Sequence, residues 1–178
     1  MAKVYLLCGK IASGKTVYAQ EIQHSQNAVL LSVDDLMLKL FGSCLGEKHN
    51  ETVANVFEYF YGLASKLLSK NIDVIFDSGF WTKEERTRVK KHFAELGVKT
   101  ELHYITMPEA QRLKMLDDRN EWLRNSPKRE YIIDRELLAK LDVKFEEPDS
   151  GEVDVLVRKC YAGQNTIEFH ETAETSRS

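Results

Sequence analysis

The chain contains little cysteine and no long apolar run. Its three cysteines, Cys8, Cys44 and Cys160, are far apart and odd in number. They therefore predict neither a disulfide framework nor a Cys-x-x-Cys metal site. No apolar run approaches the roughly 18 residues that a membrane-spanning helix needs, and the first residues lead into a strand-like segment without the apolar core of a signal peptide. We expect a cytoplasmic protein without a membrane partner.

The sequence also lacks an excess of positive charge. Its formal net charge is -3 and its pI about 6.0, so no global basic field favours a nucleic-acid partner. A local groove can still be basic on an acidic protein, so nucleic acid stays open as a partner but is not favoured. The 178 residues suffice for one hydrophobic core. We predict a single domain over residues 1–163 and a polar, flexible C-terminal tail over residues 164–178; the oligomeric state stays open.

The body of the chain alternates between short apolar runs and segments with helical periodicity. Thr82, followed three residues later by Glu85, predicts a capping box that opens one of these helices. The strand candidates are residues 3–8, 28–33, 72–76, 102–105 and 153–157. Strands that alternate with helices at this spacing predict βαβ units and a parallel sheet. Right-handed crossovers then place the carboxyl ends of the strands along one edge of the sheet.

The first strand candidate runs into the stretch "CGKIASGKT", which fits the pattern G-x-x-x-x-G-K-[ST] between a strand and a helix. Backbone N–H groups at the start of a helix bind phosphate, and glycines let the chain wrap closely around it. A lysine supplies a point charge to the outer phosphates, and a hydroxyl reaches Mg²⁺. The alternative is an accidental glycine-rich turn. The candidate nucleotide-binding residues are Gly9, Ala12, Ser13, Gly14, Lys15 and Thr16.

Two other strand candidates deliver aspartates to the same edge. Asp77 ends the run "IDVIFD" and is a candidate magnesium residue with Thr16, or else an Asx-turn residue. Asp34 and Asp35 follow the second strand candidate. A carboxylate there could orient an attacking hydroxyl and accept its proton, and we assign this base role to Asp34 and the helix start to Asp35. The alternative is that both aspartates are helix-start residues.

Several arginines lie on or just after the helix expected from Pro108 to about Arg124. Arginines that close over a transferring phosphate neutralise its equatorial oxygens, and the candidates for this catalytic role are Arg119 and Arg124. A solvated helix face is the alternative for each of them. Arg112, early in the same helix, is expected to be an ordinary surface residue.

Four stretches together resemble a known family. "GKIASGKT", "SVDDL", "VIFDSGFWTKEER" and "MPEAQRLKMLDDRN" are similar to motifs of the small P-loop kinases, which include phage-type polynucleotide 5′-kinases, chloramphenicol phosphotransferases and zeta-toxin-like kinases. The resemblance covers roughly residues 3–145, in the family's order. It implies the α/β P-loop NTPase fold, three-layer α/β/α with a five-stranded parallel sheet and a helical lid that carries an arginine.

The resemblance also implies an ATP-dependent phosphotransferase that uses Mg²⁺. Lys15 and Thr16 then match the phosphate and metal positions, and Asp34 matches the catalytic base. Asp77 matches the acidic residue after the third strand, and Arg119 or Arg124 the lid arginine.

One position departs from the polynucleotide kinases. They carry an arginine three residues after the base, where this chain has Met37. Loss of that charged contact removes on the order of 2 kcal/mol of affinity for an acceptor phosphate. We therefore predict transfer of the γ-phosphate of ATP to a hydroxyl of a small molecule. The alternatives are a polynucleotide 5′-hydroxyl kinase and a P-loop ATPase that acts as a nucleotide-gated binding module.

Overall fold

The computed structural model describes residues 1–42, 46–127, 130–163 and 167–172. Its strands are β1 (Lys3–Cys8), β2 (Ala28–Ser32), β3 (Asp73–Gly79), β4 (Lys99–Thr106), β5 (Val155–Tyr161) and β6 (Ile167–Thr172). Its helices are α1 (Lys15–Ser25), α2 (Val33–Phe41), α3 (His49–Leu68), α4 (Lys83–Glu95), α5 (Glu109–Arg124) and α6 (Arg135–Asp142), with a short 3₁₀ turn η1 (Gly46–Lys48) before α3. Cys44 lies outside the described residues.

The strands form one sheet in the order β2-β3-β1-β4-β5-β6. β1 to β5 pair in parallel, which confirms the five-stranded parallel sheet. β6 is a sixth strand and pairs antiparallel with β5, from Tyr161 opposite Ile167 to Leu156 opposite Thr172. This part of the expected tail therefore forms a strand, because pairing satisfies backbone groups along the free edge of β5. Residues 164–166 and 173–178 of that tail lie outside the described residues.

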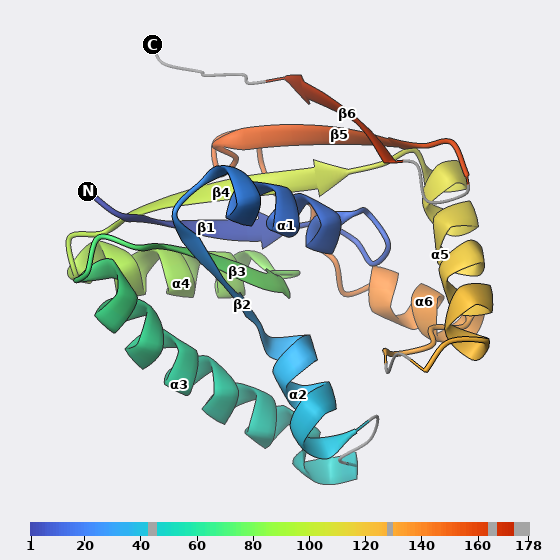
Figure 1. Cartoon of the computed structure of the whole chain (residues 1–178), viewed down its shortest axis with the longest axis horizontal. Helices are drawn as coiled ribbons and strands as arrows, with labels where there is room; N and C mark the ends of the chain where they lie inside the picture. The colour runs from blue at the N-terminus through green and yellow to red at the C-terminus, as the bar shows by residue number, and fades with distance from the viewer. Residues whose placement is uncertain (43–45, 128–129, 164–166, 173–178) are drawn as a thin grey trace.

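Helices cover both faces of the sheet and give three layers (Figure 1). α1 packs on one face, where Tyr18, Ala19 and Ile22 meet apolar residues of β1, β3, β4 and β5. α3 and α4 pack on the other face, where Val56, Phe60 and Phe93 join the larger core. α5 and α6 stand beside the loop that follows β1, at the carboxyl edge of the sheet (Figure 1). The expected three-layer α/β/α fold is confirmed.

The helix starts explain why these segments leave the sheet where they do. The Thr82 hydroxyl accepts a hydrogen bond from the backbone N–H of Glu85, and the Glu85 side chain accepts one from Thr82, so the predicted capping box is present. β2 ends one residue earlier than expected, because Ser32 caps α2 and accepts from the N–H of Asp35. Asp34 therefore lies in the first turn of α2, and Asp35 enters the helix without capping it.

The carboxyl ends of β1, β2 and β3 meet beside one another. In the sheet register, Asp77 of β3 lies between Leu7 of β1 and Ser32 of β2. The phosphate-loop candidates follow β1, and Asp34 follows Ser32 by two residues. The topology therefore brings three sequence-distant segments to one edge of the sheet.

Candidate active site

The loop between β1 and α1 has the close packing that requires glycine. Gly9 has φ 155°, and a Cβ there would lie 2.3 Å from the backbone oxygen of Ile105. Gly14 precedes α1 with φ 90°, and Ala12 is left-handed with φ 59°. The Ser13 hydroxyl is buried and makes no hydrogen bond within the described residues. A helix start and a buried, unsatisfied hydroxyl in one tight loop fit a bound anion.

Lys15 begins α1 and folds back over this loop. Its ammonium donates to the backbone oxygens of Gly9 at 2.9 Å and Lys10 at 2.7 Å. Burial lowers the pKa of Lys15, although the carboxylates of Asp77 and Asp34 act in the opposite direction. The Lys15 ammonium thus donates to two carbonyl oxygens, and a phosphate oxygen could take their place as hydrogen-bond acceptor.

Thr16 and Asp77 form the oxygen-rich side of the site. The Thr16 hydroxyl donates to Oδ2 of Asp77 at 2.8 Å, and Asp77 is buried while Thr16 is exposed. Hydroxyl and carboxylate oxygens are ligands that Mg²⁺ accepts, with phosphate oxygens and water completing its shell. The donor set therefore fits a magnesium ion held between α1 and β3.

Asp34 shares this electrostatic environment, whereas Asp35 does not. Asp34 is exposed to solvent, and partial desolvation by the neighbouring protein together with the charge of Asp77 raises the pKa of its carboxyl. Lys15, His49 and Arg119 oppose that rise. Asp35 is exposed and pairs with Lys39 at 2.7 Å, one turn further along α2. The two neighbouring aspartates therefore differ in their surroundings.

The structure separates the two arginine candidates of α5. One Nη of Arg119 donates to the backbone oxygen of Tyr131 at 2.7 Å, and its Nε lies 3.9 Å from Glu130. Burial lowers the pKa of Arg119, and the charge of Asp34 is among the groups that oppose this. Arg124 is exposed at the last residue of α5. Arg119 is thus the candidate that shares the field of Asp34.

Sequence reasoning missed Arg112, which is not a surface residue. Its side chain is 2% exposed and binds the backbone oxygen of Ile11 in the phosphate loop. The four buried residues Arg112, Leu116, Asn120 and Leu123 recur at helical spacing on one face of α5. That periodicity is the signal in the sequence that could have placed Arg112 on the inward face.

Met37 is a core residue, whereas His49 acts on the pKa of Asp34. Met37 is 2% exposed and belongs to the core cluster with Val33, Val56 and Phe60. The position that holds an arginine in polynucleotide kinases is therefore a core position here. His49, the first residue of α3, was not a candidate, and its effect on the pKa of Asp34 is the observation that brings it to the site.

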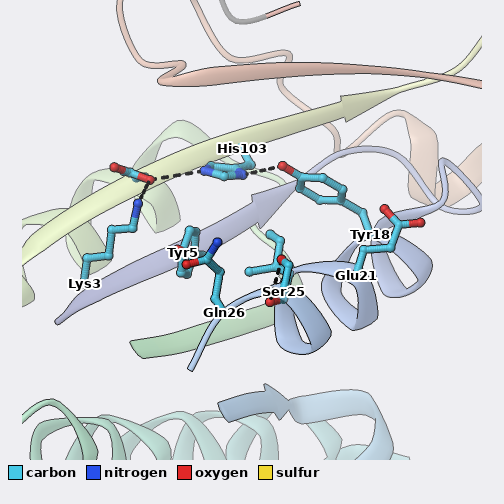
Figure 2. Close-up of a pocket in the computed structure, with 9 residues that line it drawn as sticks. Lys3, Tyr5, Tyr18, Glu21, Ser25, Gln26 and His103 are labelled. Atoms are coloured by element: carbon cyan, nitrogen blue, oxygen red, sulfur yellow. Dashed lines mark hydrogen bonds and ion pairs between the residues drawn. The ribbon is translucent and has the colours of Figure 1, made fainter. Parts of the chain in front are cut away.

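A separate cavity of about 300 Å³ is lined by residues of α1, β1 and β4 (Figure 2). Across its wall, Lys3 donates to Glu101 at 2.7 Å, and His103 lies 3.5 Å from the same carboxylate. The other ring nitrogen of His103 is 2.9 Å from the Tyr18 hydroxyl. The neighbouring His103 and Lys3 lower the pKa of Glu101 despite partial burial. Lys3 donates a hydrogen bond to this carboxylate, whereas His103 Nε2 is buried and has no hydrogen-bond partner within the described residues.

The fold and the loop geometry define a class, the P-loop NTPase fold in the form used by small kinases. The family model AAA_33, described as an AAA domain, matches residues 4–142. The chain belongs to this family, and the resemblance to the small P-loop kinases seen in its motifs is confirmed. No curated protein matches the sequence. Within the part of the chain that the structure describes, no helix could cross a membrane.

Solved structures share the fold at low sequence identity. A chain of the Pnkp1/Rnl/Hen1 RNA repair complex superposes with a TM-score of 0.65 and 19% identity, over 80% of this chain and 43% of that one. Kti12 from Chaetomium thermophilum, solved with ADP-AlF3, gives 0.62 and 16% over 91% of each chain. The APS kinase CysC from Mycobacterium tuberculosis, solved with AMPPNP and APS, gives 0.59 and 16% over 92% and 90%. This chain spans less than half the length of the RNA repair chain, and these identities establish the fold alone.

Proposed function

We propose that the protein transfers the γ-phosphate of ATP to a hydroxyl group of a small molecule. The observation that carries this proposal is the position of Asp34. It is a solvent-accessible carboxylate with a raised pKa in the electrostatic field of Lys15, Asp77 and Arg119. A general base beside a phosphate site is what transfer to an alcohol needs.

Each residue of the site has a defined task in this proposal. The loop from Gly9 to Thr16 and the start of α1 bind the phosphates through backbone N–H groups, and Lys15 leaves its two carbonyl partners to bind an outer phosphate oxygen. Thr16 and Asp77 would hold Mg²⁺, which supplies positive charge to those phosphates. Arg119 would neutralise the equatorial oxygens from the side of α5 and α6, which we take as the lid helices.

Asp34 takes the proton in the transfer step. As the acceptor oxygen forms its bond to the γ-phosphorus, the bond from that phosphorus to the bridging oxygen breaks, and ADP leaves with the electron pair. The proton of the acceptor hydroxyl passes to the Asp34 carboxylate, which releases it to solvent afterwards. The solvent exposure of Asp34 supports both substrate access and this release.

Met37 supports a small acceptor without a phosphate at that point. Its thioether is packed into the core, so this position presents no charge to an acceptor. The second candidate function is a polynucleotide 5′-hydroxyl kinase, which the similarity to a chain of an RNA repair complex favours. The net charge of -3 weighs against it.

One experiment separates these functions. ADP release is measured with Mg-ATP alone and with added nucleosides, sugars and other small alcohols, or oligonucleotides with a free 5′-hydroxyl. Stimulation by a small alcohol, with labelled phosphate appearing in it, supports the proposal, whereas stimulation by oligonucleotides alone supports the second candidate. Turnover that no acceptor raises would indicate an ATPase module and overturn both kinase assignments.

A further inference from the structure

Arg112 uses every donor of its guanidinium to join three segments. Nε and one Nη donate to the two carboxylate oxygens of Glu109, at 3.0 and 2.7 Å. The other Nη donates to the Ile11 oxygen at 2.9 Å and to Oδ1 of Asp142 at 3.2 Å, and a further N–H donates to Oδ2 of Asp142. Its five N–H groups are therefore committed to α5, to the last residue of α6 and to the phosphate loop.

The bond to Ile11 has a geometric consequence within the loop. No peptide bond in the described residues is cis. In a trans peptide the C=O of one residue and the N–H of the next point in opposite directions. A donor that binds the Ile11 oxygen from the α5 side therefore turns the N–H of Ala12 away from α5. Ala12 itself has a left-handed φ of 59°.

Apolar contacts hold the Ala12 side chain on the same side of the loop as Arg112. Ala12 is buried against Leu116 of α5 and Leu138 of α6, together with Ile133. The alanine side chain and the Ile11 oxygen are thus both held by the lid helices. The remaining polar group of this peptide, the Ala12 N–H, is left to face the interior of the loop, where Lys15 lies.

We propose that Arg112 is a positioning residue that holds the Ile11–Ala12 peptide so that the Ala12 N–H points at a bound phosphate. It couples the phosphate loop to the base of the α5–α6 lid without touching the nucleotide. The proposal rests on the phosphate-binding part of the proposed function and not on the identity of the acceptor.

Arg112 acts here through geometry and not through its charge. Glu109 and Asp142 place two carboxylates on the one guanidinium and offset much of its charge, although Arg112 is still among the groups that lower the pKa of Lys15. With five committed donors it has none left for a phosphate oxygen. A lysine at this position would keep the charge but could not bind Ile11 and both carboxylates in the same planar arrangement.

The test is binding of inorganic tripolyphosphate to the full chain, measured by calorimetry, because this probe has no base or ribose. We expect Arg112→Gln and Arg112→Lys each to weaken binding about tenfold, the effect of misdirecting one hydrogen bond to a charged group. The matched control is Arg135→Gln. Arg135 joins α6 to Asp117 of α5 at the surface, and within the described residues it makes no hydrogen bond or ion pair with the phosphate loop. The control should bind tripolyphosphate as the wild type does.

Two results would overturn the proposal. If Arg112→Lys binds like the wild type, charge alone suffices. If Arg135→Gln loses as much affinity as the Arg112 variants, docking of the lid matters and the Ile11 contact does not. If circular dichroism shows that the Arg112 variants do not fold, Asp142→Asn is measured instead. This variant should weaken tripolyphosphate binding roughly threefold, because it removes one partner that holds the Arg112 guanidinium in place. Unchanged affinity of Asp142→Asn would then overturn the proposal.

The same measurements keep this inference distinct from the proposed function. A wild-type chain that binds tripolyphosphate, shows the Arg112 effect and phosphorylates no acceptor would remove the kinase assignment and leave the positioning role in place. A wild-type chain that does not bind tripolyphosphate would overturn the positioning role itself.

Discussion

Replacing Asp34 by asparagine keeps the shape of the side chain but removes its charge and its ability to accept a proton. Nucleotide binding should persist, because in the proposed site the phosphates are bound by the loop and Lys15, which lie outside α2. Acceptor-dependent turnover at saturating ATP should fall by about 10²–10⁴, the usual contribution of a general base. The assay is ADP release with the acceptor found in the screen, with nucleotide affinity measured in parallel by calorimetry.

The matched control is Asp35→Asn, one residue along the same helix. Asp35 is exposed and pairs with Lys39, and such an i,i+4 pair stabilises a helix by about 0.3–0.5 kcal/mol. Asp35 has no role in the proposed transfer step, so this variant should release ADP at nearly the wild-type rate. If Asp35→Asn is the inactive variant, the two roles are reversed. If both variants turn over normally, Asp34 is a helix-start residue and the base assignment is wrong.

The raised pKa of Asp34 gives this prediction a second readout. Desolvation and Asp77 favour the protonated carboxyl, so the acidic limb of the kcat profile should lie at a higher pH than an ordinary aspartate would give. Because the pKa is higher in the folded state than in the unfolded state, ionisation of Asp34 lowers stability as the pH rises through the folded-state pKa. Asp34→Asn should therefore not lower the unfolding temperature at pH 7, although it removes activity. A clear loss of stability would contradict this reasoning.

Four further variants test the remaining assignments. Lys15→Ala should abolish tight binding of Mg-ATP in a folded protein, and unchanged affinity in calorimetry would refute its phosphate role. Asp77→Asn should weaken the Mg²⁺ dependence of nucleotide binding and turnover, because it removes a charge beside the Thr16 hydroxyl. An unaltered Mg²⁺ titration would indicate that Asp77 has no metal role and is a turn residue. Arg119→Gln should lower kcat by about 10²-fold or more with little change in ATP affinity, whereas Arg124→Gln should be neutral; the reverse order in steady-state kinetics would exchange the two.

The sequence alone predicted those features that depend on neighbours along the chain. The phosphate-loop pattern, the capping box of Thr82 and Glu85, and the alternation of strands with helices each act over a few residues. The parallel sheet follows from that alternation, and the confirmed edge that gathers Gly9, Asp34 and Asp77 follows from crossover handedness. The contact between Thr16 and Asp77 was therefore within reach of the sequence.

Other features depend on partners that are distant in the sequence. The sequence predicts Arg112 at the surface, whereas the fold places the backbone oxygen of Ile11, 101 residues away, against its guanidinium. Asp34 and Asp35 carry the same side chain, and they differ because packing brings Asp77, Lys15 and Arg119 near the first of them. A charged residue stays buried only where enough committed partners offset its desolvation, and those partners arrive with the fold.

The strand β6 and the packing of Met37 also depend on tertiary structure and not on the sequence pattern alone. Residues Ile167–Thr172 lie in a polar stretch that predicts a tail. In the structure they form a strand, because their backbone pairs with the free edge of β5. Such backbone pairing leaves no pattern in the side chains of the sequence. Met37 replaces an arginine of the polynucleotide kinases, a difference visible in the sequence. Tertiary structure decided that this thioether fills the core beside Phe60 and does not line an acceptor site, because burial is a property of the assembled elements and not of one helix.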